Sequence, residues 1–467
     1  MIYKLRPYQE ECVKSISDYI NSDRHDPVLI VGPVGCGKSL LIAEAARLMG
    51  DKTLILQPSK ELLQQNHDKI TSYGIPATIY SASCGKKELS NMIYATLGSI
   101  KKVVDKLKEM GIRNVLIDEA HAGYSPEDGS EFMTFMNELK PKKVIGFTAT
   151  PCRLKNMSIG QTSYSQLNFI TRMRPVYFKN LIHVIQVEEM IRQGFWTPLK
   201  YETWDFNGDA LKLNSNGSEY TAESISEAVR KNGLNNLILR RLMVLKDVCR
   251  SILVFMDSVE SCNTAAEWMN AKICAGMAEV VHGGTPKKQR EAIVEGFKSG
   301  KTKVVFNYSA LGTGFDHPGL DCVIVGRPTF SFSSFYQWLG RAVRIKDGKD
   351  SALVVDCCNN SSRFGDIRKL SIENYKGYGW GMFIGDKLIT NIPMGDKVTK
   401  TDLDIKAAKK DRRRGLAQGV TAAPVPGRPD HPLGSTVMTF GKYCGWMFHS
   451  IPVSYFCLLY TSDAADD

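Results

Sequence analysis

The sequence GPVGCGKS, residues 32–39, follows the apolar run Val28–Val31 and precedes the helix-prone stretch Leu40–Met49. Glycines let backbone N–H groups close around phosphate oxygens, and the start of a helix adds partial positive charge there. A strand, a glycine-rich turn and a helix in this order are the context that a phosphate-binding loop requires. The stretch therefore predicts an α/β fold that binds ATP. The residues expected at the nucleotide are Gly32, Gly35, Cys36, Gly37, Lys38 and Ser39.

The acidic pair Asp118 and Glu119 follows a second apolar run, Val115–Ile117. Parallel strands present their carboxyl ends to the ligand crevice, so the pair is expected beside the phosphate loop. Lys38 would reach the β- and γ-phosphates, while Ser39 and Asp118 would hold Mg²⁺. Glu119 would orient the attacking water and take its proton. The expected cofactors are therefore ATP and Mg²⁺.

A second stretch, QWLGRAVR at residues 337–344, carries two arginines. Gln337, Gly340, Arg341 and Arg344 are spaced so that a helix would place all four on one face. A glycine there permits close approach of another surface. Because the arginine fork matches phosphate oxygens, we expect Arg344 to act as an arginine finger, with Arg341 also at the γ-phosphate. The nucleotide would then lie between two domains.

Apolar runs alternate with amphipathic stretches between Val28 and Val355, which predicts two similar α/β domains in tandem. We expect the first domain at 1–200, a connection at 201–235 and the second domain at 236–400. The strands expected are Val28–Val31, Thr53–Leu56, Val115–Ile117, Val144–Phe147, Ile252–Phe255, Glu279–Val281, Val304–Phe306, Cys322–Val325 and Ala352–Val355.

The end of the chain has a different composition. Residues 401–434 are basic and then rich in Pro and Gly, as a linker would be. Residues 435–457 regain aromatic content, which predicts the start of a small accessory module. Residues 458–467 resemble a translated sequencing adapter, so we expect a non-native tail and a truncated natural sequence; a native acidic tail is the alternative.

The amino-acid composition limits the classes of partner that we expect this protein to bind. The formal net charge of +11 favours a polyanion such as nucleic acid. No apolar run approaches a membrane span and the first residues lack a signal-peptide core, so we expect a cytoplasmic protein without a membrane partner. The twelve cysteines include no Cys-x-x-Cys pair, which argues against zinc.

The sequence Asp118-Glu119-Ala120-His121 resembles the second motif of superfamily 2 DEAD/DEAH-box helicases, and further motifs of that family follow in order. Leu5–Gln9 resembles the adenine-recognition motif, and Thr148–Pro151 the motif that couples hydrolysis to strand movement. Gly312–Asp316 resembles the fifth motif. The likeness covers roughly residues 3 to 360 and implies two RecA-like parallel-sheet domains with an ATP cleft between them.

The resemblance also implies roles for individual residues. It implies nucleotide contacts from Arg6, Gln9, Gly314 and Asp316, catalytic roles for Gln337, Arg341 and Arg344, coupling by His121, Thr148 and Thr150, and nucleic-acid contacts from Pro58, Thr96, Gly98, Ser99 and Thr313.

The interval between Asp316 and Gln337 already contains the expected strand Cys322–Val325, leaving no room for the strand-separating hairpin of the RNA-remodelling branch. The motif forms look more like the DNA repair and restriction-translocase branch, from a phage or a bacterium. We therefore expect an ATP-dependent DNA helicase or translocase that prefers DNA over RNA. It would be compatible with a partner subunit in a repair or restriction complex. The alternatives are an RNA helicase and a nucleotide-gated nucleic-acid-binding module without hydrolysis.

Overall fold

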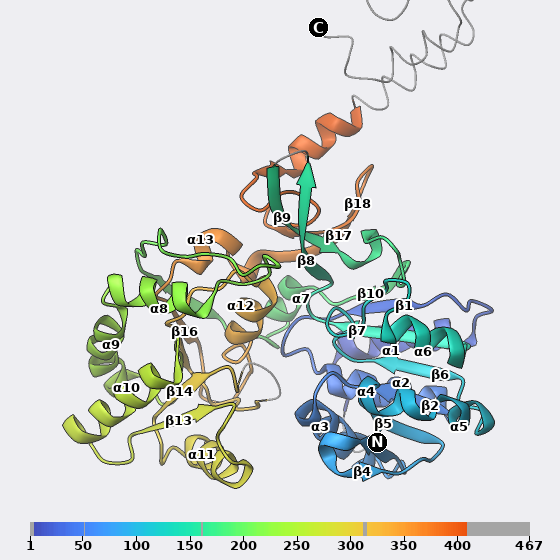
Figure 1. Ribbon diagram of the computed structural model, residues 1–467, viewed down its shortest axis with the longest axis horizontal. Helices are drawn as coiled ribbons and strands as arrows, with labels where there is room; N and C mark the ends of the chain where they lie inside the picture. The colour runs from blue at the N-terminus through green and yellow to red at the C-terminus, as the bar shows by residue number, and fades with distance from the viewer. Residues whose placement is uncertain (1–3, 51, 160–161, 312–314, 409–467) are drawn as a thin grey trace, which may run out of the picture. The chain divides into compact units, whose positions relative to one another are not determined.

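The computed structural model describes residues 4–50, 52–159, 162–311 and 315–408 (Figure 1). These residues divide into two compact units. The larger unit runs to Glu373 and also includes Trp380–Lys397, and the smaller contains Asn374–Gly379 and the described residues from Val398 onward. The larger unit holds the eight-stranded and the six-stranded sheet and every candidate site residue that the structure describes.

The first sheet has eight strands in the order β10-β1-β7-β6-β2-β5-β3-β4. Neighbouring strands are parallel except for the pair β3–β4. The central strands are buried along their whole length, as expected for a parallel sheet covered on both faces. Their bounds are β1 Val28–Val31, β2 Thr53–Leu56, β3 Thr78–Ser81, β4 Lys86–Lys87, β5 Met92–Ala95, β6 Asn114–Ile117, β7 Lys143–Thr148 and β10 Asn180–Val184.

The second sheet has six parallel strands in the order β11-β16-β15-β12-β14-β13. The expectation of two tandem parallel-sheet α/β domains is therefore confirmed. Part of the expected connection at 201–235 contributes to the second sheet and its core, through β11 and Ile225. The bounds are β11 Leu199–Thr203, β12 Ile252–Phe255, β13 Ala278–His282, β14 Val304–Tyr308, β15 Cys322–Val325 and β16 Ala352–Asp356.

Helices connect the parallel strands, and several begin with a serine or threonine whose side-chain oxygen accepts a backbone N–H, as Ser331 does for α12. The helices of the larger unit are α1 Pro7–Asn21, α2 Lys38–Met49, α3 Lys60–Thr71, α4 Leu97–Ile100, α5 Val104–Glu109, α6 Glu131–Leu139, α7 Val187–Arg192, α8 Ala222–Lys231, α9 Leu234–Val248, α10 Val259–Lys272, α11 Lys287–Ser299, α12 Phe332–Leu339 and α13 Asn360–Phe364. No helix among the described residues is both long and apolar enough to cross a membrane.

Further strands lie outside these two sheets. The antiparallel pair β8 Cys152–Ile159 and β9 Thr162–Phe169 lies between β7 and β10 in the sequence. Strands β17 Leu370–Tyr375, β18 Gly379–Ile384 and β19 Lys387–Leu388 come after the second, and β18 and β19 are antiparallel.

In the smaller unit, β20 Val398–Thr399 precedes helical residues 400–408, and the Thr399 N–H donates to the Asp402 carboxylate at 2.8 Å. The expected linker 401–434 therefore begins with helix. The remainder of the linker, the expected accessory module 435–457 and the tail 458–467 lie outside the described residues.

The expected helix through residues 337–344 is wrong in its extent, because α12 ends at Leu339. The N–H of Gly340 still bonds the carbonyl of Tyr336, but Arg341 and Ala342 form tighter turns. Beyond them the backbone leaves the helix, so both arginines lie in a loop. We call residues 341–344 the arginine loop.

Candidate nucleotide and coupling site

The phosphate loop needs its glycines for conformation and for space. Gly35 and Gly37 have φ angles of +82° and +83°, a region that side chains rarely adopt. A Cβ on Gly37 would lie 2.6 Å from Gln9 Nε2, and one on Gly32 would lie 2.7 Å from Cys36 Sγ. The loop ends where α2 begins at Lys38, so the helix N-terminus faces the phosphate position.

Lys38 and Glu119 meet across the loop, with Lys38 Nζ 2.8 Å from Glu119 Oε1. Burial opposes ionisation of Glu119, but the charge of Lys38 lowers the pKa of this carboxyl below its ordinary value. Glu119 also has a φ of +46°, a strained conformation for a residue with a side chain. Such strain is typical of functional sites, and here it turns the carboxylate toward the phosphate loop.

Asp118 is buried beside this pair. Asn66 Nδ2 donates to Asp118 Oδ2 at 3.0 Å, and the Glu119 N–H donates to Oδ1 at 2.9 Å. Burial and the charge of Glu119 raise the pKa of Asp118 to about 7. A divalent cation would offset this penalty, and Mg²⁺ takes few protein ligands beside phosphate oxygens and water. The carboxylate of Asp118 and the hydroxyl of Ser39 fit that requirement.

The adenine-motif residues contact the phosphate loop directly. Gln9 Oε1 accepts the Arg6 N–H at 3.0 Å, and Gln9 Nε2 donates to the carbonyl of Cys36 at 2.9 Å. Tyr8 donates to the same carbonyl at 3.1 Å. The guanidinium of Arg6 lies 4.6 Å from the ring centre of Phe195. Arg6 and Gln9 are therefore fixed relative to the loop.

The three expected coupling residues form one hydrogen-bonded chain. His121 Nδ1 is 2.8 Å from Thr148 Oγ1, which accepts the Thr150 N–H at 3.0 Å. Ser333 on α12 lies 3.2 Å from both Thr150 Oγ1 and His121 Nε2. Burial lowers the pKa of His121 to about 4, so the ring is neutral at pH 7. A helix between β15 and β16 of the second sheet thus contacts residues at the carboxyl ends of β6 and β7 in the first.

The two arginines share one anchor. Arg341 Nη1 and Arg344 Nη1 donate to the carbonyl of Phe315, at 2.6 and 3.0 Å, and Arg344 also pairs with Asp316. Burial and the neighbouring Arg344 lower the pKa of Arg341 to about 9. After Lys38 and His121, the charge of Arg341 also contributes to the low pKa of Glu119.

Gly340, which directly precedes the arginine loop, packs closely against the phosphate loop. A Cβ on Gly340 would lie 2.5 Å from Val34 Cγ2, so only glycine fits there without a shift. The expected close approach at this glycine is therefore present. Gln337 takes a different position: it lines a cavity of about 260 Å³ with Phe255, Asn307 and Trp338. The single face expected for residues 337–344 is thus wrong, because Gln337 lies on the helix and the arginines lie beyond it.

The expected nucleic-acid contacts of the first domain lie at the carboxyl ends of two neighbouring strands. Pro58 follows β2 and Thr96 follows β5, which are parallel neighbours with Leu56 opposite Ala95. Pro58 and Gly98 are exposed, while Thr96 and Ser99 are half-buried. Thr96 Oγ1 donates to Ser99 Oγ at 3.1 Å, which in turn accepts the Ala82 N–H at 3.0 Å. Thr313 and Gly314 lie outside the described residues.

The sequence alone did not single out several residues that hold this site. Arg153 on β8 donates to the carbonyls of His121 and Tyr124, both at 2.6 Å, and thereby fixes the turn after Asp118. Asn66 and Ser333 are further examples. An isolated Asn, Arg or Ser carries no motif, so only the tertiary contacts reveal these roles.

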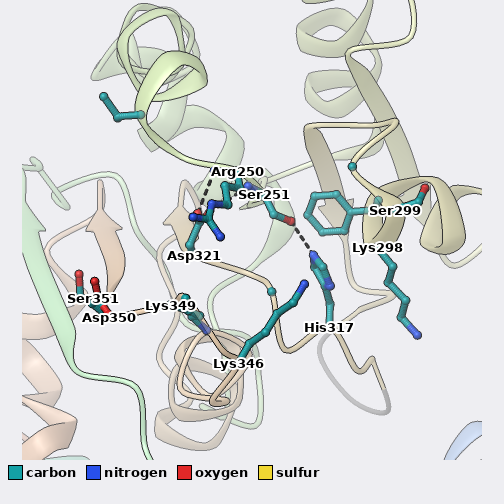
Figure 2. A pocket seen from close by; sticks show the side chains of 15 residues that line it. Arg250, Ser251, Lys298, Ser299, His317, Asp321, Lys346, Lys349, Asp350 and Ser351 are labelled. Carbon is teal, nitrogen blue, oxygen red and sulfur yellow. Dashed lines mark hydrogen bonds between the residues drawn. The ribbon is translucent and has the colours of Figure 1, made fainter.

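A basic cavity of about 380 Å³ is lined by Lys346 and Lys349, which follow the arginine loop in the sequence (Figure 2). Figure 2 shows Ser251 joined to His317 by a hydrogen bond, which is 2.7 Å long, with Lys346 and Lys349 nearby. Burial lowers the pKa of Lys349 to about 8. Its Nζ donates to the carbonyls of Ala342 and Arg344 at 2.7 and 2.8 Å, so this lysine supports the arginine loop from the cavity side.

Known families match both halves of the chain. Residues 2–153 match the family described as Type III restriction enzyme, res subunit, and residues 234–346 match the Helicase conserved C-terminal domain. A 51.5 kDa protein of a Lactococcus phage (isolate 7-9) is 25% identical over 332 residues, which cover 70% of this chain and 65% of that protein.

The yeast protein named "Putative ATP-dependent helicase IRC3", from Saccharomyces cerevisiae, is 24% identical over 279 residues, covering 59% of this chain and 38% of its own length. The chain therefore spans less than two thirds of either relative. Among solved structures, the ATP-dependent Type ISP restriction-modification enzyme LlaBIII bound to DNA aligns with a TM-score of 0.55 and 15% identity, over 76% of this chain and 28% of that one. This likeness shows a common two-domain fold.

Proposed function

We propose that this chain, which belongs to helicase superfamily 2 and to its restriction and repair branch, hydrolyses ATP between two RecA-like domains in order to move along DNA. The observation that carries the proposal is the packing of Gly340 against Val34. This contact brings the arginine loop to the phosphate loop, where Lys38 and Glu119 already form an ion pair. A phosphoryl group there would be enclosed by groups from both domains.

Different residues of the chain have different roles in the proposed ATP hydrolysis. Lys38 and the helix N-terminus attract phosphate, and Ser39 and Asp118 would hold Mg²⁺, which neutralises charge on the phosphates when bound. Glu119 stays ionised beside Lys38 and can accept the proton of the attacking water. Arg341 and Arg344 would stabilise negative charge that develops on the transferred group. The hydrogen bonds that link His121 to Ser333 would couple hydrolysis at this site to the residues expected to contact nucleic acid.

DNA is favoured over RNA by the likeness to restriction enzymes, one of which was solved bound to DNA. The absence of space for a hairpin before Gln337 points the same way. An RNA helicase remains the second candidate. A binding module without hydrolysis is disfavoured because Lys38, Asp118 and Glu119 are together in place. We further propose a cytoplasmic site of action, in a bacterial or phage-infected cell, with a partner subunit of a repair or restriction complex.

The test is the rate of ATP hydrolysis with single-stranded DNA, duplex DNA, forked DNA and RNA at two salt concentrations. We expect DNA to stimulate turnover, and Lys38→Ala or Glu119→Gln to abolish it. Glu131→Gln is the matched control, since this carboxylate is an exposed partner of Lys101. Stimulation by RNA and not by DNA would replace the proposal with the second candidate, and no turnover with any polymer would replace it with the binding module.

Arg344→Ala separates catalysis from binding. We expect nucleotide affinity to stay within about twofold while turnover falls by about 10³-fold, the scale seen when an arginine finger is lost. Equal loss of affinity and turnover would remove the finger assignment from Arg344.

A further inference from the structure

Three consecutive residues, Phe195, Trp196 and Thr197, lie between α7 and β11 and contact the adenine motif, the phosphate loop and the arginine loop. We call them the strap. Trp196 and Thr197 are buried, with 2% and 3% of their surfaces exposed. Neither belongs to a motif noted in the sequence, and the proposed mechanism assigns the strap no role.

At one end the strap contacts the adenine motif. The ring of Phe195 packs edge-on against Tyr8 with centroids 5.3 Å apart, and its face carries the guanidinium of Arg6. Tyr8 in turn bonds the phosphate-loop carbonyl of Cys36. The position of Phe195 is thus tied to the residues expected around the base.

In the middle the strap contacts the phosphate loop. Trp196 Nε1 donates to the carbonyl of Val34 at 2.8 Å. A buried indole N–H left without an acceptor is destabilising, so this bond fixes the tryptophan to the loop. The side chain of the same Val34 lies against Gly340. The backbone carbonyl of Val34 therefore bonds the strap, and its side chain contacts Gly340, which directly precedes the arginine loop.

At the other end the strap holds the arginine loop. The N–H of Thr197 donates to the carbonyl of Val343 at 2.8 Å, and its hydroxyl donates to the carbonyl of Arg344 at 2.7 Å. Because this loop lies beyond the end of α12, these carbonyls have no helical partners. Thr197 supplies donors from one side, and Lys349 supplies them from the cavity side.

We propose that Trp196 and Thr197 are positioning residues that link the phosphate loop to the arginine loop, so that nucleotide in the first sets the place of Arg344. The inference rests on the proposed function, because it gives Arg344 a role in hydrolysis. Displacing a catalytic group by about 1 Å can cost on the order of 10²-fold in rate, so two hydrogen bonds to the backbone of this loop suffice to control turnover.

Two substitutions each remove one hydrogen bond; Thr197→Val keeps the shape of the side chain, whereas Trp196→Phe also shortens the buried ring system. Thr197→Val removes the hydroxyl bond to Arg344 and keeps the backbone bond to Val343. Trp196→Phe removes the N–H that bonds Val34. The matched controls are Thr71→Val, whose hydroxyl bonds an exposed helix carbonyl, and Trp204→Phe, whose indole donates to Glu202 at the same 2.8 Å.

Kinetics with full-length protein decide between a positioning and a merely structural role. We expect Thr197→Val to lower nucleic-acid-stimulated kcat about tenfold and to leave the KM for ATP within about twofold, a split that marks loss of transition-state stabilisation. In an Arg344→Ala background the same change should have no further effect, because Thr197 acts through that arginine. An equal loss in both backgrounds, or no loss in the wild-type background, overturns the proposal.

Tryptophan emission gives a readout that does not need turnover. A non-hydrolysable ATP analogue should change the emission of the wild-type protein and of Trp204→Phe but not that of Trp196→Phe. An analogue that binds without altering the Trp196 signal overturns the link. If the wild-type protein hydrolyses no ATP with DNA or RNA, the proposed function fails separately, and the emission still decides whether the strap responds to nucleotide.

Discussion

At the scale of single residues, burial decides which groups are charged. Lys38, Asp118 and Glu119 share one buried site, and their mutual charges keep Lys38 and Glu119 ionised. At His121 burial outweighs the nearby charge of Glu119, so this ring is held neutral. The sequence indicated the first three correctly as neighbours, because the carboxyl ends of parallel strands meet at one edge. It could not indicate Asn66 or Arg153, whose partners are set only by tertiary packing.

His317 gives a prediction about stability. Burial and the nearby charges of Lys346, Lys298 and Lys349 lower its pKa to about 4, from an ordinary value of 6.5. Between these values the unfolded chain binds the proton and the folded chain does not, so the free energy of unfolding should fall as the pH drops from about 6.5 toward 4. At pH 5 this ring should lower the free energy of unfolding by about 1 kcal/mol relative to neutral pH, after allowance for solvent screening.

Urea unfolding of wild type and His317→Asn at pH 7.5 and pH 5 measures this effect. The variant should lose less stability on acidification, and the difference isolates His317 from His121, whose pKa is low as well. Identical pH dependence in the two proteins would contradict the assignment.

At the scale of elements, the sequence was most informative where strands are buried on both faces. The bounds expected for Val28–Val31, Thr53–Leu56, Ile252–Phe255 and Cys322–Val325 are those observed, because such strands are continuous apolar runs. Strand β10, Asn180–Val184, was not predicted, since it lies at a sheet edge and carries mixed polarity. The end of α12 was missed because helical spacing continues in the sequence, while the backbone turns toward Thr197 and Lys349.

The contact between α12 and the phosphate loop can be tested by adding one methyl group. Gly340 has a helical backbone, with φ of −61°, so alanine there is not strained in itself. Its Cβ would nevertheless lie 2.5 Å from Val34 Cγ2. We expect Gly340→Ala to separate the loops and to lower stimulated kcat by about 10²-fold, the cost of a small misplacement.

Adding Val34→Gly to Gly340→Ala removes the obstructing side chain and should restore part of the rate. Gly208→Ala is the control, because its Cβ would meet only Leu211 at an ordinary 3.4 Å. Full activity of Gly340→Ala would show that the contact does not bear on hydrolysis.

At the scale of the whole molecule, the net charge of +11 and the neighbouring strand ends at Pro58 and Thr96 predict how nucleic acid binds. Contacts to backbone phosphates release counterions, so affinity for single strands should fall with salt by about 0.7 logarithmic units per phosphate for each tenfold rise in concentration. Engagement of about three phosphates would weaken binding at least about tenfold between roughly 50 and 200 mM salt. Homopolymers of different base should give the same slope, since phosphates carry no sequence information. Fluorescence anisotropy of a labelled single strand measures this slope directly, and parallel titration of a nucleotide analogue reports whether salt acts on the ATP site instead. A slope near zero, or a slope that depends on the base, would show that this chain reads bases rather than tracking the phosphate backbone as a translocase must.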